Sequence, residues 1–226
     1  MQRLLHGYLR HRYAALFYAL ILAIGGGPLL AAFDVDRNWL RIFLELTLFA
    51  AVFGFAPTRH SRILRIALAV GLGGRLATLL LQHRPLAFAT QPAVIVLAFV
   101  AALGALVYAL RASEIGAEHV YAALDAYLLA GVFCGMLHFE IEHAWPGSYV
   151  SNGAPLPAFP LATAVYFSFV TLATLGYGDI VPQSEVARGV TVVEAIAGQL
   201  YLAVLIARLV SNATASRAPA IEEPRT

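Results

Sequence analysis

The sequence predicts an all-α membrane protein with six transmembrane helices and one short re-entrant helix. The chain of 226 residues is 60% hydrophobic and only 12% charged, whereas soluble domains usually contain about 25% charged residues. Several apolar runs approach the length of about 20 residues with which a helix crosses a bilayer. A shorter apolar run leads into the glycine-containing segment Thr174–Asp179, which cannot continue a helix comfortably.

Six apolar segments are long enough to cross the membrane, or nearly so, and a seventh is not. The six segments are residues 13–33, 39–56, 63–81, 92–110, 120–139 and 188–210. The first is longer than the apolar core of a signal peptide, which has about 7–15 residues, so we expect a retained helix. The segment 160–174 is too short to span, and we expect it to enter and leave the membrane on the same side.

Arginine supplies all the strong positive charge, because the sequence contains no lysine. Short loops rich in arginine face the cytoplasm. If the six segments cross in turn, most arginines lie on the side of the two termini. These are Arg3, Arg10, Arg12, Arg59, Arg62, Arg65, Arg111, Arg208, Arg217 and Arg225. We therefore expect a multi-pass protein of the cell (inner) membrane with both termini in the cytoplasm and the re-entrant segment entering from outside.

The segment Thr174–Asp179 has the pattern expected of a backbone that binds cations. Gly176 and Gly178 are spaced by one residue, and glycine adopts positive φ without steric cost. Such dihedrals at alternate residues turn successive carbonyl groups to one side, where they can replace the water around a potassium ion. Non-helical backbone at membrane depth is tolerated where it lines a cavity. We predict that this segment lines an ion pathway, with Tyr177 directed away from the axis.

The stretch Tyr166–Asp179 reads Tyr-Phe-Ser-Phe-Val-Thr-Leu-Ala-Thr-Leu-Gly-Tyr-Gly-Asp. It resembles the pore helix and selectivity filter of tetrameric potassium channels, especially the bacterial ion-channel pore family, and the similarity covers residues 120–211. The resemblance implies a homotetramer, since one chain contributes one strand of carbonyls and a single strand cannot surround an ion. It implies that potassium, as permeant ion and not as cofactor, is coordinated by the filter carbonyls. The filter residues are Thr174, Leu175, Gly176 and Tyr177, completed by Gly178.

Two positions depart from the usual pattern of that family. Ala173 stands where a first threonine is common, and Leu175 stands where valine is usual; neither changes the Gly-Tyr-Gly core. The resemblance places Asp179 at the outer mouth, hydrogen-bonded behind the filter to Tyr166, where many relatives have tryptophan. Thr171 lies at the C-terminal end of the pore helix, whose partial negative charge favours a cation.

Two residues of the segment 188–210 are candidates for filter support and gating. Glu194 is a carboxyl at membrane depth, where acidic residues are costly and usually functional or paired. It can bond behind the filter to the pore helix or raise the cation concentration in the cavity, and we expect the first. Gly198 occupies the place of the gating hinge in the family, with close helix packing as an equal alternative.

The resemblance divides the chain into three parts. Residues 1–115 are expected to form a four-helix N-terminal membrane domain, and residues 116–211 the pore domain, with an extracellular turret at 140–159. Residues 212–226 are polar and are expected to form a disordered cytoplasmic tail. The first four helices match a voltage sensor in number only. Because 92–110 contains no arginine, we predict weak voltage dependence.

The remaining polar residues in apolar surroundings give weaker signals. Asp125 is expected to make a structural hydrogen bond, and Cys134 to be a small buried residue. Glu45 and Arg75 match in depth within their helices, so we expect a buried ion pair. A last group is expected to belong to the solvated turret, with a divalent-metal site or a proton sensor as the lesser alternative. It comprises His138, Glu140, Glu142 and His143.

These features predict a potassium-selective channel subunit that conducts passively. A non-conducting or modulatory subunit is the nearest alternative, and a membrane transporter or enzyme is a more distant one. The sequence has no paired metal-ligand motif, nucleotide-binding loop or nucleophile elbow, which argues against an enzyme. No feature indicates a nucleic-acid partner, a cofactor or a particular gating stimulus; the expected surroundings are the lipid bilayer and potassium ions.

Overall fold

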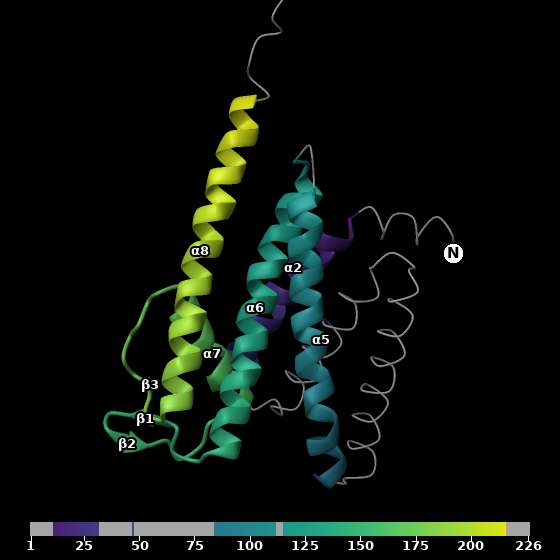
Figure 1. The fold of residues 1–226 in the computed structure, drawn as a ribbon. Coiled ribbons are helices and arrows are strands. Elements are labelled where there is room, and N and C mark those ends of the chain that lie inside the picture. Colours follow the sequence, from purple (N-terminus) through teal and green to yellow (C-terminus); the bar gives the residue numbers. More distant parts are fainter. Residues whose placement is uncertain (1–10, 32–46, 48–83, 112–114, 216–226) are drawn as a thin grey trace, which may run out of the picture.

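The computed structural model is mostly helical in the part of the chain that it describes (Figure 1). That part comprises residues 11–31, 47, 84–111 and 115–215. Its elements in chain order are α2 (Arg12–Ala31), α5 (Arg84–Arg111), α6 (Ala117–Ala144), β1 (Tyr149–Ser151), β2 (Ala154–Pro155), α7 (Leu161–Leu172), β3 (Val181–Pro182) and α8 (Glu185–Ala215). The predicted helices 39–56 and 63–81, together with the predicted pair of Glu45 and Arg75, lie outside the described residues.

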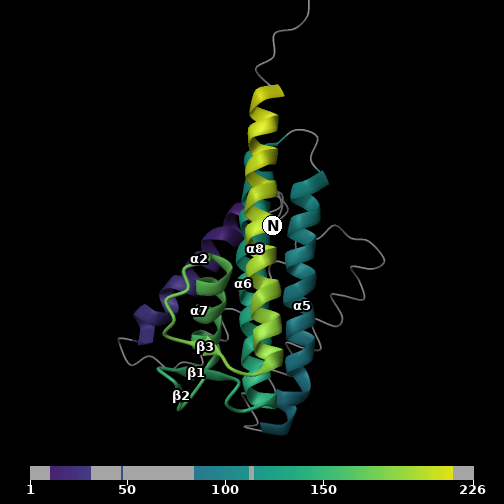
Figure 2. The same ribbon diagram turned by 60° about the vertical axis from the view of Figure 1, so that its left-hand side comes forward.

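Helix α6 lies at the centre of the described helices and contacts α2, α5, α7 and α8 (Figures 1 and 2). Two glycines bring α7 close to it. A Cβ atom at Gly131 would lie 2.5 Å from the ring of Phe169, and one at Gly135 would lie 2.7 Å from the Cα atom of Val165. Small residues let helix backbones approach closely in membranes. The short helix α7 therefore packs against α6 with the two helix backbones close together.

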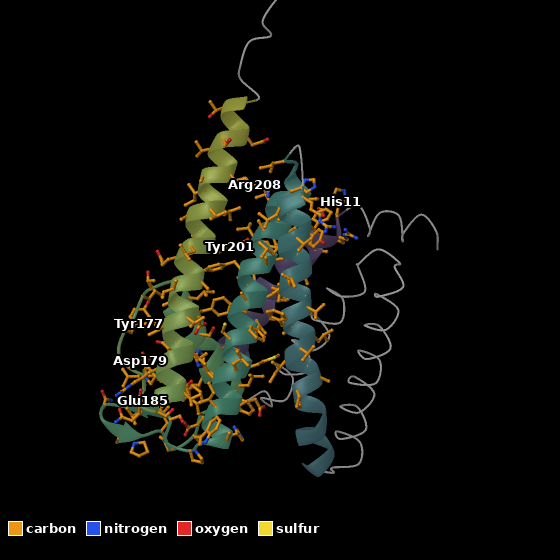
Figure 3. All side chains as sticks on the ribbon, viewed as in Figure 1. His11, Tyr177, Asp179, Glu185, Tyr201 and Arg208 are labelled. Carbon is orange, nitrogen blue, oxygen red and sulfur yellow. The ribbon has the colours of Figure 1, made fainter. Side chains whose placement is uncertain are left out.

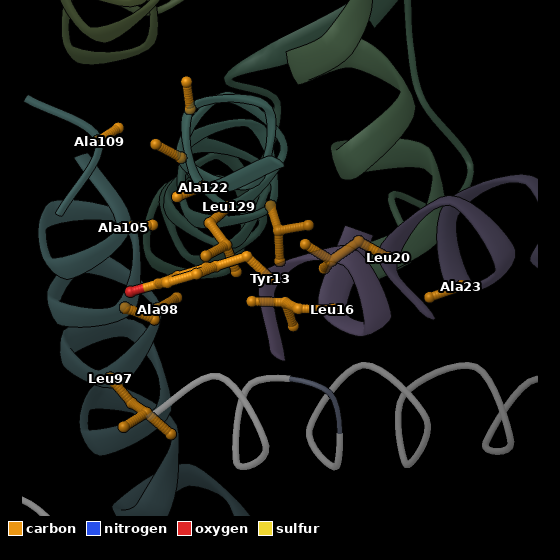
Figure 4. Packing of buried hydrophobic residues seen from close by; sticks show 14 of the residues in the cluster. Tyr13, Leu16, Leu20, Ala23, Leu97, Ala98, Ala105, Ala109, Ala122 and Leu129 are labelled. Atoms are coloured by element: carbon orange, nitrogen blue, oxygen red, sulfur yellow. The ribbon is translucent and has the colours of Figure 1, made fainter. Parts of the chain in front are cut away.

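The main apolar cluster joins α2, α5 and α6 (Figure 4). Leu20 of α2 and Leu129 of α6 are fully buried, and the cluster includes small buried residues of α5 such as Ala98 and Ala105. The ring of Tyr13 stacks on that of Tyr108, with centroids 4.6 Å apart. Because lipid is as apolar as these side chains, close packing is what stabilises their association. This packing fixes α2 and α5 against α6.

Three of the described helices have the length and composition to cross a membrane. They are Pro92–Arg111, Ala117–Ala144 and Glu185–Asn212. These helices correspond to the last three predicted spans. The apolar helices Arg12–Gly26 and Leu161–Leu172 are shorter, the second of them in agreement with the predicted re-entrant segment. The chain is thus a membrane protein with three candidate spans among its described residues.

Helices α6 and α8 continue further at their C-terminal ends than the sequence predicted. Helix α6 continues to Ala144, so Glu140, Glu142 and His143 belong to a helix and not to the turret loop. Helix α8 continues to Ala215 and so includes the first residues of the segment that was predicted to be a disordered tail. Hydropathy marks where a helix leaves the apolar layer, but the backbone hydrogen bonds continue beyond that point, so both ends were predicted too early.

A small antiparallel sheet closes the loop end of the molecule, with its strands in the order β2-β1-β3. Tyr149 of β1 pairs with Pro182 of β3, and Val150 pairs with Val181. The sheet therefore joins the segment before α7 to the segment that follows Thr174–Asp179. The sequence analysis expected an irregular turret here, because strands of two or three residues are too short to show an alternating pattern.

Tyr149 is the centre of a second apolar cluster next to the sheet. Its side chain is fully buried. Its ring stacks on Phe159 with centroids 4.7 Å apart and meets Phe167 edge-on at 5.3 Å. Phe159 precedes α7 and Phe167 lies within it, so this cluster fixes α7 to the sheet at one end of the molecule.

Candidate functional site

Helix α7 leads directly into the segment Thr174–Asp179, called the filter loop from here on. The backbone amide of Thr174 donates to the carbonyl of Thr171, and that of Leu175 donates to the carbonyl of Val170, both at 2.9 Å. These bonds use carbonyl groups that a helix end otherwise leaves without a partner. The filter loop therefore leaves α7 in a fixed direction.

The filter loop alternates between two backbone conformations. The angle φ is 56° at Thr174, 56° at Gly176 and 76° at Gly178, whereas Leu175 and Tyr177 between them have no positive φ. With this alternation, successive carbonyl groups can point to one side and form a row of oxygens for a cation. The positive φ that the sequence analysis expected at alternate residues is present at both glycines.

Thr174 extends this alternation to a residue that is not glycine. A β-branched residue rarely adopts positive φ, and such a conformation costs about 1–3 kcal/mol unless the surroundings impose it. The Cβ positions at Gly176 and Gly178 meet no described atom within 4 Å, so the dihedral angle and not the space requires glycine there. Backbone strain of this kind often marks a functional segment, and here it marks the end of the filter loop next to α7.

The side chains of the filter loop are exposed in a single chain. Leu175 is 55% exposed and Tyr177 is 66% exposed, and Figure 3 shows Tyr177 and Asp179 at the edge of the molecule beside α8. Large exposed apolar side chains also follow α8. They are Val186, Val192, Val193, Ile196, Leu200, Val204, Ile206 and Val210. An apolar surface of this kind requires lipid or another chain to cover it.

The C-terminal end of the filter loop is joined to α7 by one hydrogen bond. The hydroxyl of Tyr166 donates to Oδ2 of Asp179 at 2.8 Å, which is the contact expected from the sequence. Tyrosine therefore supplies a donor at this position, as the indole N–H of tryptophan would. Because Tyr166 is 42% exposed, water competes for the bond, and its net contribution is about 0.5–1.5 kcal/mol.

Glu194 of α8 is buried, with 3% of its surface exposed, and it reaches α7. The hydroxyl of Ser168 lies 2.5 Å from Oε1 of Glu194 and 2.7 Å from the carbonyl oxygen of Gly131. Cys134 of α6 is a further neighbour of Glu194. Glu194 thus makes the contact with the pore helix that we expected. Glu194 also lines the cavity between α5, α6 and α8 that is described below, so the enrichment of cations there stays a prediction.

His138 of α6 is the site residue that the sequence analysis placed wrongly. It was assigned to the solvated turret, but it is fully buried. Its Nε2 atom lies 2.7 Å from Oε2 of Glu194, and its Nδ1 atom lies 2.6 Å from the hydroxyl of Tyr149. The spacing of Gly131, Gly135 and His138 could have indicated this position, since residues at i, i+4 and i+7 share one helix face. That face meets α7.

The other members of the predicted turret group serve the end of α6. The carboxylate of Glu142 accepts hydrogen bonds from the backbone amides of Gly147 at 2.8 Å and Tyr149 at 3.1 Å, which fixes the turn after the helix. The Nδ1 atom of His143 lies 3.0 Å from the carbonyl oxygen of Phe139. Within the described ranges, no three side chains of histidine, cysteine, aspartate or glutamate come together as metal ligands.

Gly198 of α8 lies against the end of α7. A Cβ atom at this position would lie 2.7 Å from the carbonyl oxygen of Leu172 and 2.9 Å from its Cδ1 atom. Close packing therefore explains the glycine in the observed state, and the hinge stays a prediction. A cavity of about 440 Å³ between α5, α6 and α8 is lined in part by Leu172, Gly198 and Tyr201. It leaves space beside α8 at the predicted hinge.

Asp125 of α6 is fully buried, and neither of its carboxylate oxygens has a hydrogen-bond partner in the described part of the chain. The structural hydrogen bond expected from the sequence is therefore wrong. The neighbouring Tyr201 of α8 directs its hydroxyl to the carbonyl oxygen of Ala123 instead; Figure 3 shows Tyr201 between α8 and α6. A buried carboxyl without a partner destabilises the fold.

Three candidate spans, a short helix between two of them and a loop with alternating positive φ together define the class of protein as an ion channel. A family model described as ion channel matches residues 95–215, more than half of the chain. The match includes α6, α7, the filter loop and α8. The chain therefore belongs to the ion channel family.

Similar proteins include several potassium channels. The two pore potassium channel c of Oryza sativa subsp. japonica is 34% identical over 93 residues, which are 41% of this chain and 18% of that protein. The voltage-gated potassium channel Kch of Escherichia coli (strain K12) is 50% identical over 50 residues, 22% of this chain and 12% of that protein. The inward rectifier potassium channel Kirbac3.1 of Paramagnetospirillum magnetotacticum is 36% identical over 78 residues, 34% of this chain and 21% of that protein.

The chain spans 12% to 21% of the length of these three relatives. The similarity therefore concerns one segment of each relative, and the activities of the whole relatives do not follow from it. No solved structure matches the chain.

Proposed function

We propose that the chain is a subunit of a potassium-selective channel that conducts passively. The observation that carries the proposal is the filter loop, in which φ is positive at Thr174, Gly176 and Gly178 directly after a short helix. A potassium ion enters a narrow passage only where other oxygens replace its water. In the proposed filter, the carbonyl oxygens of Thr174, Leu175, Gly176 and Tyr177 coordinate the ion, and Gly178 completes the loop.

The proposed assembly is a homotetramer. One filter loop supplies one strand of carbonyls, and a closed symmetric ring of identical chains supplies the strands that surround an ion. The exposed side chains of Leu175 and Tyr177, and those of α8 such as Val193 and Leu200, support this proposal. In the assembly, neighbouring copies cover the filter loop and part of α8, and lipid covers the rest.

The contacts behind the filter loop are proposed to hold it in its conducting form. Asp179 is held by Tyr166 at the outer end, and Glu194 holds α7 through Ser168. The carbonyl end of α7 near Thr171 carries partial negative charge, which favours a cation at the inner end of the filter.

The proposed orientation places the outer end of the filter loop outside the cell and both termini in the cytoplasm of a cell (inner) membrane protein. Figure 3 shows His11 and Arg208 at the opposite end of the molecule from Asp179, as the preference of positive charge for the cytoplasmic side requires. The remaining features of the proposal are six spans, an N-terminal membrane domain at 1–115 and an inner-gate hinge at Gly198.

Potassium flux from liposomes that contain the purified protein tests the proposal. We expect potassium flux well above sodium flux under matched gradients. Gly178→Ala places a side chain at a φ of 76°, which costs about 1–2 kcal/mol in each chain, and we expect it to abolish the flux. The control is Gly189→Ala in α8, where the Cβ also meets no described atom within 4 Å and φ is not positive.

Three results distinguish the alternatives. Equal potassium and sodium flux contradicts selectivity, and equal loss in Gly178→Ala and Gly189→Ala contradicts the role of the filter loop. Assembled protein that carries no potassium flux supports the alternative of a non-conducting or modulatory subunit.

A further inference from the structure

A chain of buried polar contacts behind α7 joins four elements. It runs from the hydroxyl of Tyr149 in β1 to Nδ1 of His138 in α6, and from Nε2 of His138 to Oε2 of Glu194 in α8, with distances of 2.6 and 2.7 Å. From Oε1 of Glu194 it continues to the hydroxyl of Ser168 in α7 and on to the carbonyl oxygen of Gly131, with distances of 2.5 and 2.7 Å. The channel proposal assigns roles to Glu194 and Ser168 but none to the histidine.

The number of protons in this chain follows from the chemistry of its members. Each of the four contacts needs one proton to be a hydrogen bond. The phenol of Tyr149, a neutral imidazole on His138 and the hydroxyl of Ser168 supply three in total. The fourth must reside on Oε1 of Glu194 and face Ser168, because a proton on His138 instead would leave Ser168 with one proton for two acceptors. In this arrangement the histidine and the carboxyl are both neutral.

The surroundings favour that neutral form. The side chains of His138 and Glu194 are 0% and 1% exposed, and an uncompensated charge in such a place is strongly unfavourable. Within the described residues, His138 is the ion-pair partner of Glu194. The titratable neighbours of the pair in the described part of the chain supply no positive charge. They are Cys134 and Tyr127 in α6 and Tyr149 in β1, with Glu142 beyond Tyr149.

Tyr149 is suited to remain the proton donor at the end of the chain. It lies in β1, outside the candidate spans, and its hydroxyl is bonded to His138. Burial raises the pKa of the Tyr149 phenol, and the nearby carboxylate of Glu142 raises it further. The phenol therefore keeps its proton, and Nδ1 of His138 accepts it in a hydrogen bond while Nε2 carries the proton that faces Glu194.

We propose that His138 is a positioning residue for the filter, and that it holds the protonated carboxyl of Glu194, which in turn holds Ser168 and helix α7 in place. The inference rests on the proposed potassium conduction, because the filter loop follows α7. When Glu194 loses its proton, Ser168 has one proton for two acceptors and gives up either Glu194 or Gly131. A second proton leaves a buried positive charge. Conduction therefore peaks where the pair is neutral and falls at both more alkaline and more acidic pH.

Glu194→Gln is the informative variant. The glutamine amide reproduces the neutral acid, since its oxygen accepts from His138 and its nitrogen donates to Ser168, but it does not gain or lose a proton. Potassium flux from liposomes is measured from about pH 5 to 9, the range in which histidine pairs commonly change charge. We expect the potassium flux of wild type at the limits of this range to be more than about threefold lower than its peak value. Glu194→Gln should conduct at a level similar to wild type at its optimum and show no pH dependence.

Two further variants complete the test. His138→Phe keeps a ring against Phe167, whose centroid lies 4.9 Å from that of His138, but it leaves Glu194 without its partner, and we expect more than tenfold loss of flux. His143→Gln changes an exposed histidine on the same helix and should keep the wild-type pH profile. Size-exclusion chromatography in detergent shows whether each variant still assembles.

The outcomes separate this inference from the channel proposal. If wild type carries no potassium flux at any pH, the channel proposal is wrong. If wild type conducts and Glu194→Gln shows the same pH profile as wild type, flat or curved, the proposed protonated carboxyl of Glu194 is wrong while the channel proposal stands. If His138→Phe fails to assemble, the comparison of Glu194→Gln with wild type still decides.

Discussion

Replacement of Gly135 by alanine tests the contact that positions the pore helix. Gly135 lies on the face of α6 that meets α7. An added Cβ would lie 2.7 Å from Cα, 2.8 Å from Cγ2 and 3.1 Å from the backbone nitrogen of Val165. Two of these three atoms belong to the backbone, so no rotation of a side chain relieves the contact. Helix α7 must move away from α6, and it carries the filter loop with it.

The expected magnitude follows from the cost of adding a methyl group to a packed site. Such overpacking costs about 1–3 kcal/mol. Alanine is a better helix former than glycine by about 0.5–1 kcal/mol, so the measured loss is the difference between these two effects. For a chain of this size, about 1 kcal/mol lowers the melting temperature by roughly 2–4 °C. We therefore expect a loss of a few degrees, together with reduced potassium flux.

The assay is thermal unfolding of the detergent-solubilised protein, followed by circular dichroism, in parallel with liposome flux. Gly25→Ala in α2 is the matched control, because its Cβ meets no described atom within 4 Å. The control should be unchanged or slightly more stable. A Gly135→Ala protein that melts with the control and conducts like wild type would falsify the idea that backbone contact with α6 positions α7.

Two other changes give predictions with distinct readouts. Tyr166→Phe removes the hydrogen bond to Asp179 and so destabilises that end of the filter loop by about 0.5–1.5 kcal/mol. The potassium current should therefore decay faster than in wild type, and Tyr166→Trp should restore the wild-type rate of decay. Identical decay in all three proteins argues against a role of the bond. Asp125→Asn replaces a buried carboxyl that has no described partner by a neutral amide. The melting temperature should therefore rise by a few degrees. A fall in the melting temperature would show that the carboxyl stabilises the fold.

The filter loop could be predicted from the sequence because its requirements are local. Gly176 and Gly178 are needed for their positive φ, and this need is visible in two residues and their spacing. The hydrogen bond from Tyr166 to Asp179 also lies within one short segment. The positive φ of Thr174 was not expected, since a β-branched residue gives no sign of it.

The contacts behind the filter loop could not be predicted in full, because they join distant segments. His138 and Glu194 are 56 residues apart, and each appears in the sequence as a lone polar residue. The depth of Glu194 in the membrane segment allowed its contact with the pore helix to be predicted. His138 lies near the end of an apolar run, and hydropathy alone does not distinguish a turret residue there from one on a buried helix face. The lack of a partner for Asp125 is likewise a property of packing and not of the sequence.

The structure links the pore helix to its surroundings at three levels. Glycines of α6 set its distance from the bundle, the aromatic cluster around Tyr149 fixes it to the sheet, and Ser168 receives the chain of contacts through His138 and Glu194. Since the filter loop is continuous with α7, a substitution in any of these three sets of contacts is expected to alter the proposed ion pathway. Conduction and stability should therefore change together in variants of these residues, except in Glu194→Gln.

The reversal potential of currents through the purified protein, with potassium on one side of a planar bilayer and sodium on the other, tests the central claim most directly. The account predicts a reversal potential close to that of a membrane permeable to potassium alone, and no current from Gly178→Ala under the same conditions. A reversal potential near zero, which shows equal passage of the two ions, contradicts the claim that the filter loop selects potassium.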